Sequence, residues 1–181
     1  MSVAAQQDIS TRTWTIDKVH SHVGFAVKHM VVSTFRSRFE DYDGALNVGE
    51  DGAPTLEGYV NVDSVVVKDE NLAGHLKAPD FFDSERYPEL RFESTSIRRE
   101  GDELVVDGEL TVKDNTRPVE ARGTIVGPHE DIAGATKVGL TLETTVDRTA
   151  FGLNWNAPLP KGGFALANDV TLQVELELAK A

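Results

Sequence analysis

The sequence predicts an all-β fold: an extended antiparallel β-barrel of about eight strands with a short helical segment around residues 70–84. Three observations support this prediction. Apolar and polar residues alternate with a period of two, turn-forming residues separate the alternating segments, and helical periodicity is almost absent. Each segment has one polar face, which excludes a parallel sheet covered on both sides. A barrel is favoured over a sandwich because closure removes exposed strand edges.

The N-terminal strands show the alternation first. The segment 21–29 is regular, whereas 34–48 shifts its register, which indicates a bulge or bend near residues 42–44. In chain order, strands are expected at residues 14–17, 21–29, 34–48, 56–63, 90–95, 104–113, 119–125, 138–147 and 170–178.

The C-terminal strands are the most regular. Segments 104–113 and 119–125 are separated by Asp114 and Asn115, so we expect them to form a hairpin. Residues 148–167 form a long excursion marked by glycine and proline, and the strand at 170–178 closes the pattern.

The stretch 74–92 departs from the alternation because it concentrates apolar rings between two prolines. A helix here should end by Pro79, and the adjacent Phe81 and Phe82 require an apolar environment. Two interpretations remain open: these rings cap one end of a hydrophobic core, or they close a cavity that holds an apolar ligand.

Length and charge restrict the domain organisation and the function. The 181 residues indicate one domain at 13–181, preceded by a flexible segment at 1–12. A net charge of −12 argues against nucleic acid and against docking on an anionic membrane, and no apolar run is long enough for stable membrane insertion. The N-terminus does not resemble a secretory signal, so we expect a cytoplasmic protein. The absence of cysteine excludes disulfides and thiol catalysis.

Residue chemistry favours binding over catalysis. No nucleophile elbow, phosphate loop, dinucleotide fingerprint or zinc-protease motif occurs, and we expect neither a cofactor nor catalytic residues. His20 and His22 share a strand face but have no third metal ligand at a convincing spacing, so no metal site is expected. His29 and His75 either form hydrogen bonds at an element end or contact a ligand head group.

A barrel of about eight strands is either filled by its own side chains or left open for one small ligand. Small inward residues such as Gly58, Gly108, Ala121 and Gly123 favour an open lumen. The candidate ligand-binding residues are the inward positions of the strands and the aromatic and polar residues expected at the barrel ends: Val23, Phe25, Val27, His29, Phe39, Val60, Val62, His75, Leu76, Phe81, Phe82, Phe92, Leu110, Leu140, Leu142, Arg148, Phe151, Trp155 and Leu172.

Five motifs occur in a specific order along the chain: HSHVGFAVKHMVVSTFRSRF, HLKAPDFFDSERYPELRF, DGELTVKDNTRPVEARG, DRTAFGLNW and NDVTLQVELEL. From about Trp14 to Leu178 the chain thereby resembles the YceI-like family of polyisoprenoid-binding, lipocalin-like proteins. The resemblance implies a lipocalin-like barrel whose lumen holds a long isoprenoid, quinone or fatty-acyl chain without a covalent reaction.

Physical reasoning is consistent with such a ligand, because each buried CH₂ contributes about 0.8 kcal/mol. An anionic head group would need basic residues, and the sequence alone does not rank the candidates: Lys28, Arg36, Lys77, Arg148 and Lys161. The leading hypothesis is a carrier or sequestering protein for such a lipid. The alternatives are a structural or interaction module with a self-filled core and, third, a lipid-modifying enzyme. A monomer and a homodimer both remain open.

Overall fold

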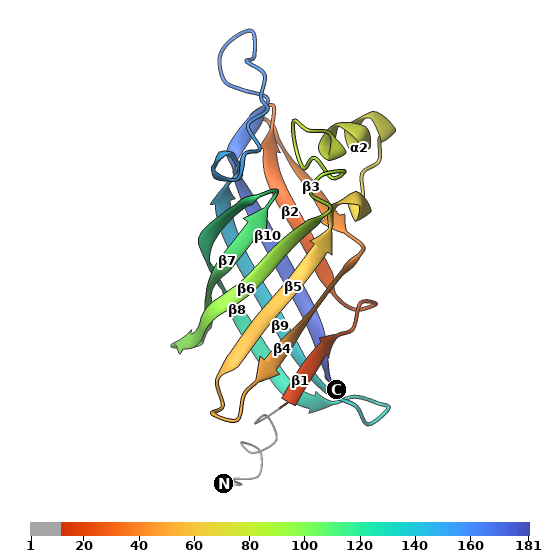
Figure 1. Cartoon of the computed structure of the whole chain (residues 1–181), viewed down its shortest axis with the longest axis vertical. Helices are drawn as coiled ribbons and strands as arrows, with labels where there is room; N and C mark the ends of the chain where they lie inside the picture. The colour runs from red at the N-terminus through yellow and green to blue at the C-terminus, as the bar shows by residue number, and fades with distance from the viewer. Residues whose placement is uncertain (1–11) are drawn as a thin grey trace.

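The computed structural model describes residues 12–181 and shows an elongated antiparallel β-barrel with one short helix at one end (Figure 1). This confirms the expected fold class. The predicted flexible segment lies outside the described residues except for Arg12, which begins β1. The strands are β1 Arg12–Ile16, β2 His22–His29, β3 Ser33–Phe39, β4 Tyr42–Val48, β5 Pro54–Asn61, β6 Glu89–Glu100, β7 Glu103–Val112, β8 Asn115–Glu130, β9 Thr136–Asp147 and β10 Leu166–Lys180.

Pairing between β1 and β10 closes a ring of eight strands in the order β1-β4-β5-β6-β7-β8-β9-β10. The other two strands extend the same sheet. β2 pairs with β10 between Leu166 and Glu175, whereas β1 pairs with the final residues of β10, so the two strands share one edge of β10 in succession. None of the helices in the described part of the chain is long and apolar enough to cross a bilayer.

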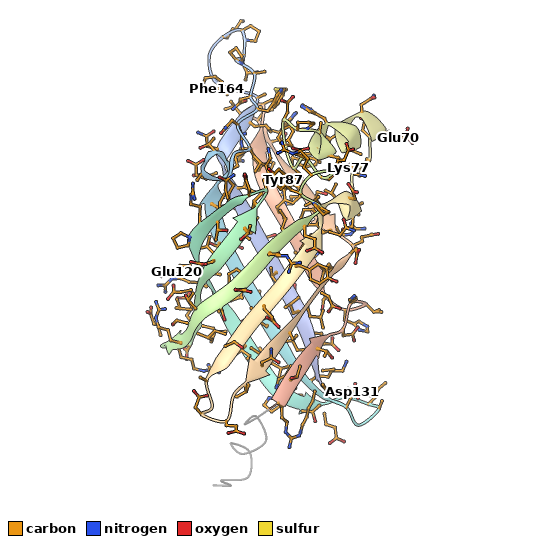
Figure 2. All side chains as sticks on the ribbon, in the orientation of Figure 1. Glu70, Lys77, Tyr87, Glu120, Asp131 and Phe164 are labelled. Carbon is orange, nitrogen blue, oxygen red and sulfur yellow. The ribbon has the colours of Figure 1, made fainter. Side chains whose placement is uncertain are left out.

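The two ends of the barrel carry different elements (Figure 1). The helix end carries helix α2 (Glu70–Lys77), the β2–β3 turn and the loop at 152–165, which contains Phe164 (Figure 2). The turn end carries the β4–β5 turn and the β8–β9 turn, which contains Asp131 (Figure 2).

The expected strand at 34–48 is divided into β3 and β4 by Glu40 and Asp41, close to the predicted bend. β4 pairs with both β1 and β5, but β3 pairs with β2 alone among the strands described. The chain after β5 runs along the other edge of β3 instead: the Glu40 amide donates to the Ser64 carbonyl at 3.3 Å, and the Val66 amide donates to Arg38 at 2.9 Å. The helix end is therefore closed partly by the segment 62–88.

Segment 62–88 contains a 3₁₀ turn (η1, Val62–Ser64) and α2. Asp69 caps α2 by accepting a hydrogen bond from the Leu72 amide at 2.9 Å, and the helix ends before Pro79 as expected. The helix itself is shorter than the helical segment predicted at 70–84, because the residues that follow fold into turns. These turns return the chain to the helix: the Phe82 amide donates to the Leu76 carbonyl at 3.0 Å.

The expected hairpin between 104–113 and 119–125 is formed by β7 and β8. Its two-residue turn consists of Lys113 and Asp114, one position earlier than expected, with Lys113 in the left-handed region at φ 58°. β8 is also longer than predicted, since it begins at Asn115 and extends to Glu130.

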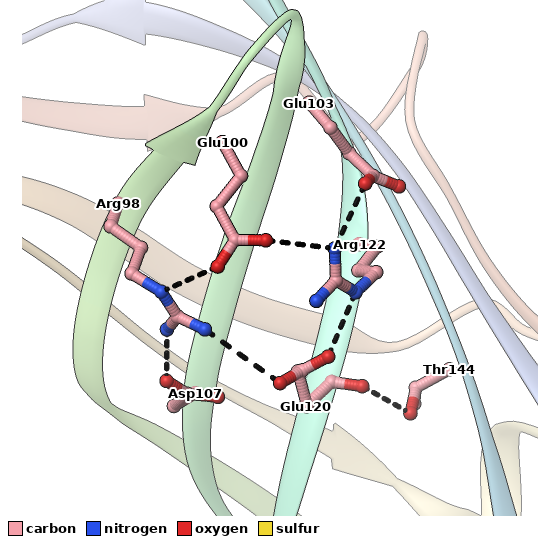
Figure 3. Close-up of polar contacts among 7 residues, drawn as sticks. All are labelled: Arg98, Glu100, Glu103, Asp107, Glu120, Arg122 and Thr144. Carbon is pink, nitrogen blue, oxygen red and sulfur yellow. Dashed lines mark hydrogen bonds and ion pairs between the residues drawn. The ribbon is translucent and has the colours of Figure 1, made fainter.

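Ion pairs join β6, β7 and β8 on the outside of the barrel (Figure 3). Val105 lies between Arg98 and Arg122 in the sheet register and is completely buried. Glu100 accepts hydrogen bonds from both arginines at 3.2 Å. These two bonds lower the pKa of Glu100, and the bond from Arg122 has the larger effect. The acidic partners of the two arginines come from all three strands: Glu100, Glu103, Asp107 and Glu120.

Candidate functional site

A cavity of about 550 Å³ occupies the helix end of the barrel. Its wall combines the inner faces of several strands with α2 and with the loop that follows β9. The lining residues are Phe25, Val27, His29, Met30, Ser33, Thr34, Phe35, Phe39, Leu72, His75, Leu76, Phe81, Phe82, Leu90, Leu110, Val112, Val146, Arg148, Phe151, Leu153, Trp155, Ala165, Leu166, Val170 and Leu172.

Aromatic rings form two groups in this wall. On the strand side, the Phe25 ring centroid lies 5.6 Å from Phe39, and Phe39 meets Phe82 edge-on at 6.1 Å. On the helix side, His75 packs edge-on against both Phe81 and Trp155, each at 4.8 Å between centroids. Phe81 and Phe82, the pair singled out in the sequence, thus contribute to the wall of a cavity rather than to a solid cap.

A smaller cavity of about 180 Å³ adjoins the first and extends toward the turn end. It also includes Val23, Val60, Phe92 and Leu142. The two cavities share four lining residues, which we call the neck: Phe39, Leu90, Leu110 and Leu172.

Arg148 is the one charged side chain in the wall that is almost completely buried, with 5 % of its surface exposed. It belongs to the 3₁₀ turn η2 (Arg148–Phe151), which Asp147 caps by accepting a hydrogen bond from the Thr149 amide. The guanidinium donates to three backbone carbonyls: Nε to Ala167 at 2.8 Å, and Nη1 to Leu153 at 2.6 Å and to Trp155 at 2.9 Å. Arg148 therefore holds the loop after β9 against the start of β10.

Thirteen of the nineteen residues expected to bind ligand line the larger cavity. Val23, Val60, Phe92 and Leu142 line the smaller one. Val62 and Leu140 line neither cavity. Val62, in η1, is 1 % exposed, and Leu140 belongs to the packed core of the turn end. Strand parity places both residues inward but does not indicate at which height the barrel is filled.

Several wall residues were not among the sequence candidates. Alternation could have identified Phe35, Leu90, Val112, Val146 and Val170, because each shares a strand face with a residue that was chosen. No period marks the remaining ones, which lie in turns, in α2 or at element ends: Met30, Ser33, Thr34, Leu72, Leu153, Ala165 and Leu166.

Of the four small inward residues, Gly58 and Ala121 line the smaller cavity, whereas Gly108 and Gly123 line neither cavity. A Cβ at Gly108 would meet the Phe92 ring at 2.4 Å, so the missing side chain makes room for that ring. A Cβ at Gly123 would meet the Thr141 carbonyl at 1.6 Å, which shows that the strands approach closely there. These glycines tighten the barrel wall.

A polar cluster at the turn end resembles a metal site in composition, but an ammonium group sits within it. The cluster consists of Asp17, His20 and Glu177, and Lys137 Nζ lies 3.2 Å from both carboxylates. His20 Nδ1 lies 3.0 Å from Asp17 Oδ2, and this hydrogen bond raises the pKa of His20. The same bond, with those from Lys137 and the Val19 amide, lowers the pKa of Asp17 to about 2. The cluster is therefore an ion-pair group.

Comparisons with known proteins agree with this geometry. The family model of the YceI-like domain matches residues 14–178. A UPF0312 protein of Staphylococcus aureus (strain N315) is 30 % identical over 172 residues, covering 92 % of this chain and 96 % of the relative.

Solved structures show the same fold. BcnA of Burkholderia cenocepacia superimposes with a TM-score of 0.75 at 21 % identity, over 90 % of this chain and 98 % of that protein. A polyisoprenoid binding domain of Saccharophagus degradans does so with a TM-score of 0.64 at 9 % identity, over 95 % of this chain and 100 % of that domain. By its sequence match and its barrel, the chain belongs to the YceI-like family.

Proposed function

We propose that this protein binds a long-chain apolar lipid in the helix-end cavity and carries or sequesters it without changing it chemically. The ligand classes that fit are a polyisoprenoid, an isoprenoid quinone and a fatty-acyl compound. The observation that carries the proposal is a cavity of about 550 Å³ with an almost entirely apolar wall inside a barrel. The polyisoprenoid binding described for the Saccharophagus degradans domain supports it.

The energetics favour a flexible tail as the main source of affinity. Ten CH₂ groups moved from water into this wall would contribute about 8 kcal/mol before the cost of ordering the tail is subtracted. The neck leads into the smaller cavity, so a tail longer than the first cavity has further apolar space. We therefore expect affinity to increase with tail length until both cavities are filled.

The chemistry of the wall supports binding rather than catalysis. The two hydroxyls that border the cavity belong to Ser33 and Thr34, and Ser33 Oγ donates to the backbone carbonyl of His29, at 3.4 Å, rather than to an imidazole nitrogen. Among the described residues, no aspartate or glutamate lines the cavity, and the Asp80 carboxylate near a wall histidine lies 4.0 Å from His75 Nε2, beyond hydrogen-bonding distance.

Two measurements test the proposal. Purified protein is denatured and extracted with organic solvent, and the extract is examined by mass spectrometry. Protein freed of lipid is then titrated with prenyl alcohols of increasing length while its melting temperature is recorded. A co-purified lipid, or a melting temperature that increases with ligand concentration, is the expected result. A lipid-free extract together with no shift for any prenyl or fatty-acyl compound would refute the proposal.

A further inference from the structure

In the part of the chain that the structure describes, basic residues are the only titratable groups in the wall of the helix-end cavity. These residues are His29, His75 and Arg148, and no described aspartate or glutamate lines this cavity. The whole chain has 30 acidic and 18 basic residues, so the wall has the opposite balance to the rest of the protein. A cavity that only had to exclude water around a hydrocarbon tail would need no positive charge.

The Arg148 guanidinium has one nitrogen that its structural role leaves unused. Nε and Nη1 together donate to three backbone carbonyls, whereas Nη2 is buried and has no hydrogen-bond partner among residues 12–181. The adjacent carboxylate of Asp147 is engaged by Thr149, whose amide and hydroxyl both donate to Oδ1, at 2.9 and 2.6 Å. Burial lowers the pKa of Arg148, and the nearby charge of Asp147 opposes this effect only in part.

The side-chain atom Trp14 Nε1 is also buried without a partner among the described residues, and the contrast is informative. The Trp14 indole is neutral and lies in the packed core of the turn end. Nη2 belongs to a cation whose side chain lines the helix-end cavity, next to space that a ligand can occupy. An unpaired buried donor on a charged group raises the free energy of the protein without ligand. A ligand atom that accepts a hydrogen bond from Nη2 would remove this penalty.

We infer that Arg148 Nη2 is the head-group subsite of this cavity, and that the preferred ligand is a single-tailed lipid ending in an anionic oxygen, a carboxylate or a phosphate. The inference rests on the proposed function, because it assigns an orientation and a chemical class to the same ligand. The head group lies against η2 at the helix end, and the tail extends past Phe39 and Leu110 through the neck. This ranks the basic residues: Lys28, Arg36, Lys77 and Lys161 do not line the cavity.

Three ligands with one tail test this assignment on the unmodified protein: geranylgeraniol, geranylgeranoic acid and geranylgeranyl phosphate. Their dissociation constants are measured by titration calorimetry. The expected result is that at least one of the two anions binds about 10-fold to 100-fold more tightly than the alcohol, as for hydrogen bonds to a charged donor. The more tightly bound anion identifies whether the head group is a carboxylate or a phosphate.

Two variants locate the effect. Arg148→Met should bind the alcohol and the anions with similar affinity, and Lys161→Met, a basic residue of the same end outside the wall, should keep the preference. If Arg148→Met does not fold, the comparison of the three ligands on the unmodified protein still decides the head-group class. Equal binding of all three ligands would overturn the subsite but leave lipid binding intact. Failure of all three to bind would instead refute the proposed function itself.

Discussion

The two halves of the barrel share several strands but are filled differently. At the turn end, inward side chains meet in a packed cluster that includes Trp14, Leu104, Leu140 and Leu178. At the helix end, inward residues of the same strands border a cavity. Leu172 and Leu178 illustrate the contrast, since they lie on one face of β10 yet the first lines the cavity and the second is fully buried.

The difference lies in how each half is closed. At the turn end, β1 joins β4 to β10, and its Trp14 indole fills the interior. At the helix end, β3 has no strand on its outer edge, and the segments 62–88 and 148–165 complete the wall. The half that is closed by paired strands is thus the packed one, and the half that is closed partly by loops contains the larger cavity.

The largest expected effect on stability is at the turn end. Leu178→Ala should lower the free energy of unfolding by about 2–5 kcal/mol, because it removes a fully buried side chain and leaves a new void. Urea denaturation measures this loss.

Leu172→Ala provides the matched control on the same strand face. We expect a loss of about 1 kcal/mol, since this side chain already borders empty space and its removal enlarges an existing cavity. Equal losses for the two variants would mean that the two halves are packed alike.

Filling the neck should separate binding from stability. Leu110→Trp places a larger ring where the two cavities meet, so the affinity for geranylgeraniol should fall by about 10-fold or more while the free energy of unfolding changes by less than about 1 kcal/mol. Calorimetry and urea denaturation on the same preparation measure both quantities.

The matching substitution at the turn end is Leu104→Trp. Its site is already packed, so overpacking should cost about 1–3 kcal/mol of stability. If Leu110→Trp were destabilising to the same degree, or left prenyl binding unchanged, the neck would not be the passage for the tail.

The smallest effect on stability is expected for the ion pairs on the outside of the barrel, which lie apart from both the packed core and the cavity. The folded pKa of Glu100 is below its ordinary value of 4.5, so its contribution to stability is present above that value and is lost as the pH falls through the folded pKa. Glu100→Gln should lower the melting temperature slightly at about pH 7, and this difference should shrink as the pH falls through the folded pKa of Glu100. A difference that stays constant down to acid denaturation would show that the charge of Glu100 is not its cause.

The strands could be predicted from the sequence because alternation reports directly which residues face inward. It identified Phe25, Val27 and Leu172 as inward residues, and the motif around Phe81 indicated where the pattern is interrupted. Leu140 has the same parity but lies in the solid half, because parity carries no information on the height at which a barrel is filled.

The polar part of the site was harder to predict. Arg148 was one of several basic candidates, and only the fold shows that its guanidinium is buried against loop carbonyls. The prediction for Gly108 and Gly123 was wrong for a related reason, since the effect of a glycine depends on which atom of the neighbouring strand occupies the space beside it.

The most direct test uses the two tryptophans of the chain, one in each half: Trp155 in the cavity wall and Trp14 in the packed core. A long-chain fatty acid with bromine in mid-tail is titrated into the unmodified protein and into Trp155→Phe, with thermal shift as an independent measure of binding. We expect bound ligand to quench the emission of the unmodified protein, and Trp155→Phe to bind the ligand with much weaker quenching, because Trp14 lines neither cavity. Binding that leaves the emission of the unmodified protein unchanged, or that quenches Trp155→Phe to the same extent, would contradict the claim that the ligand occupies the helix-end cavity.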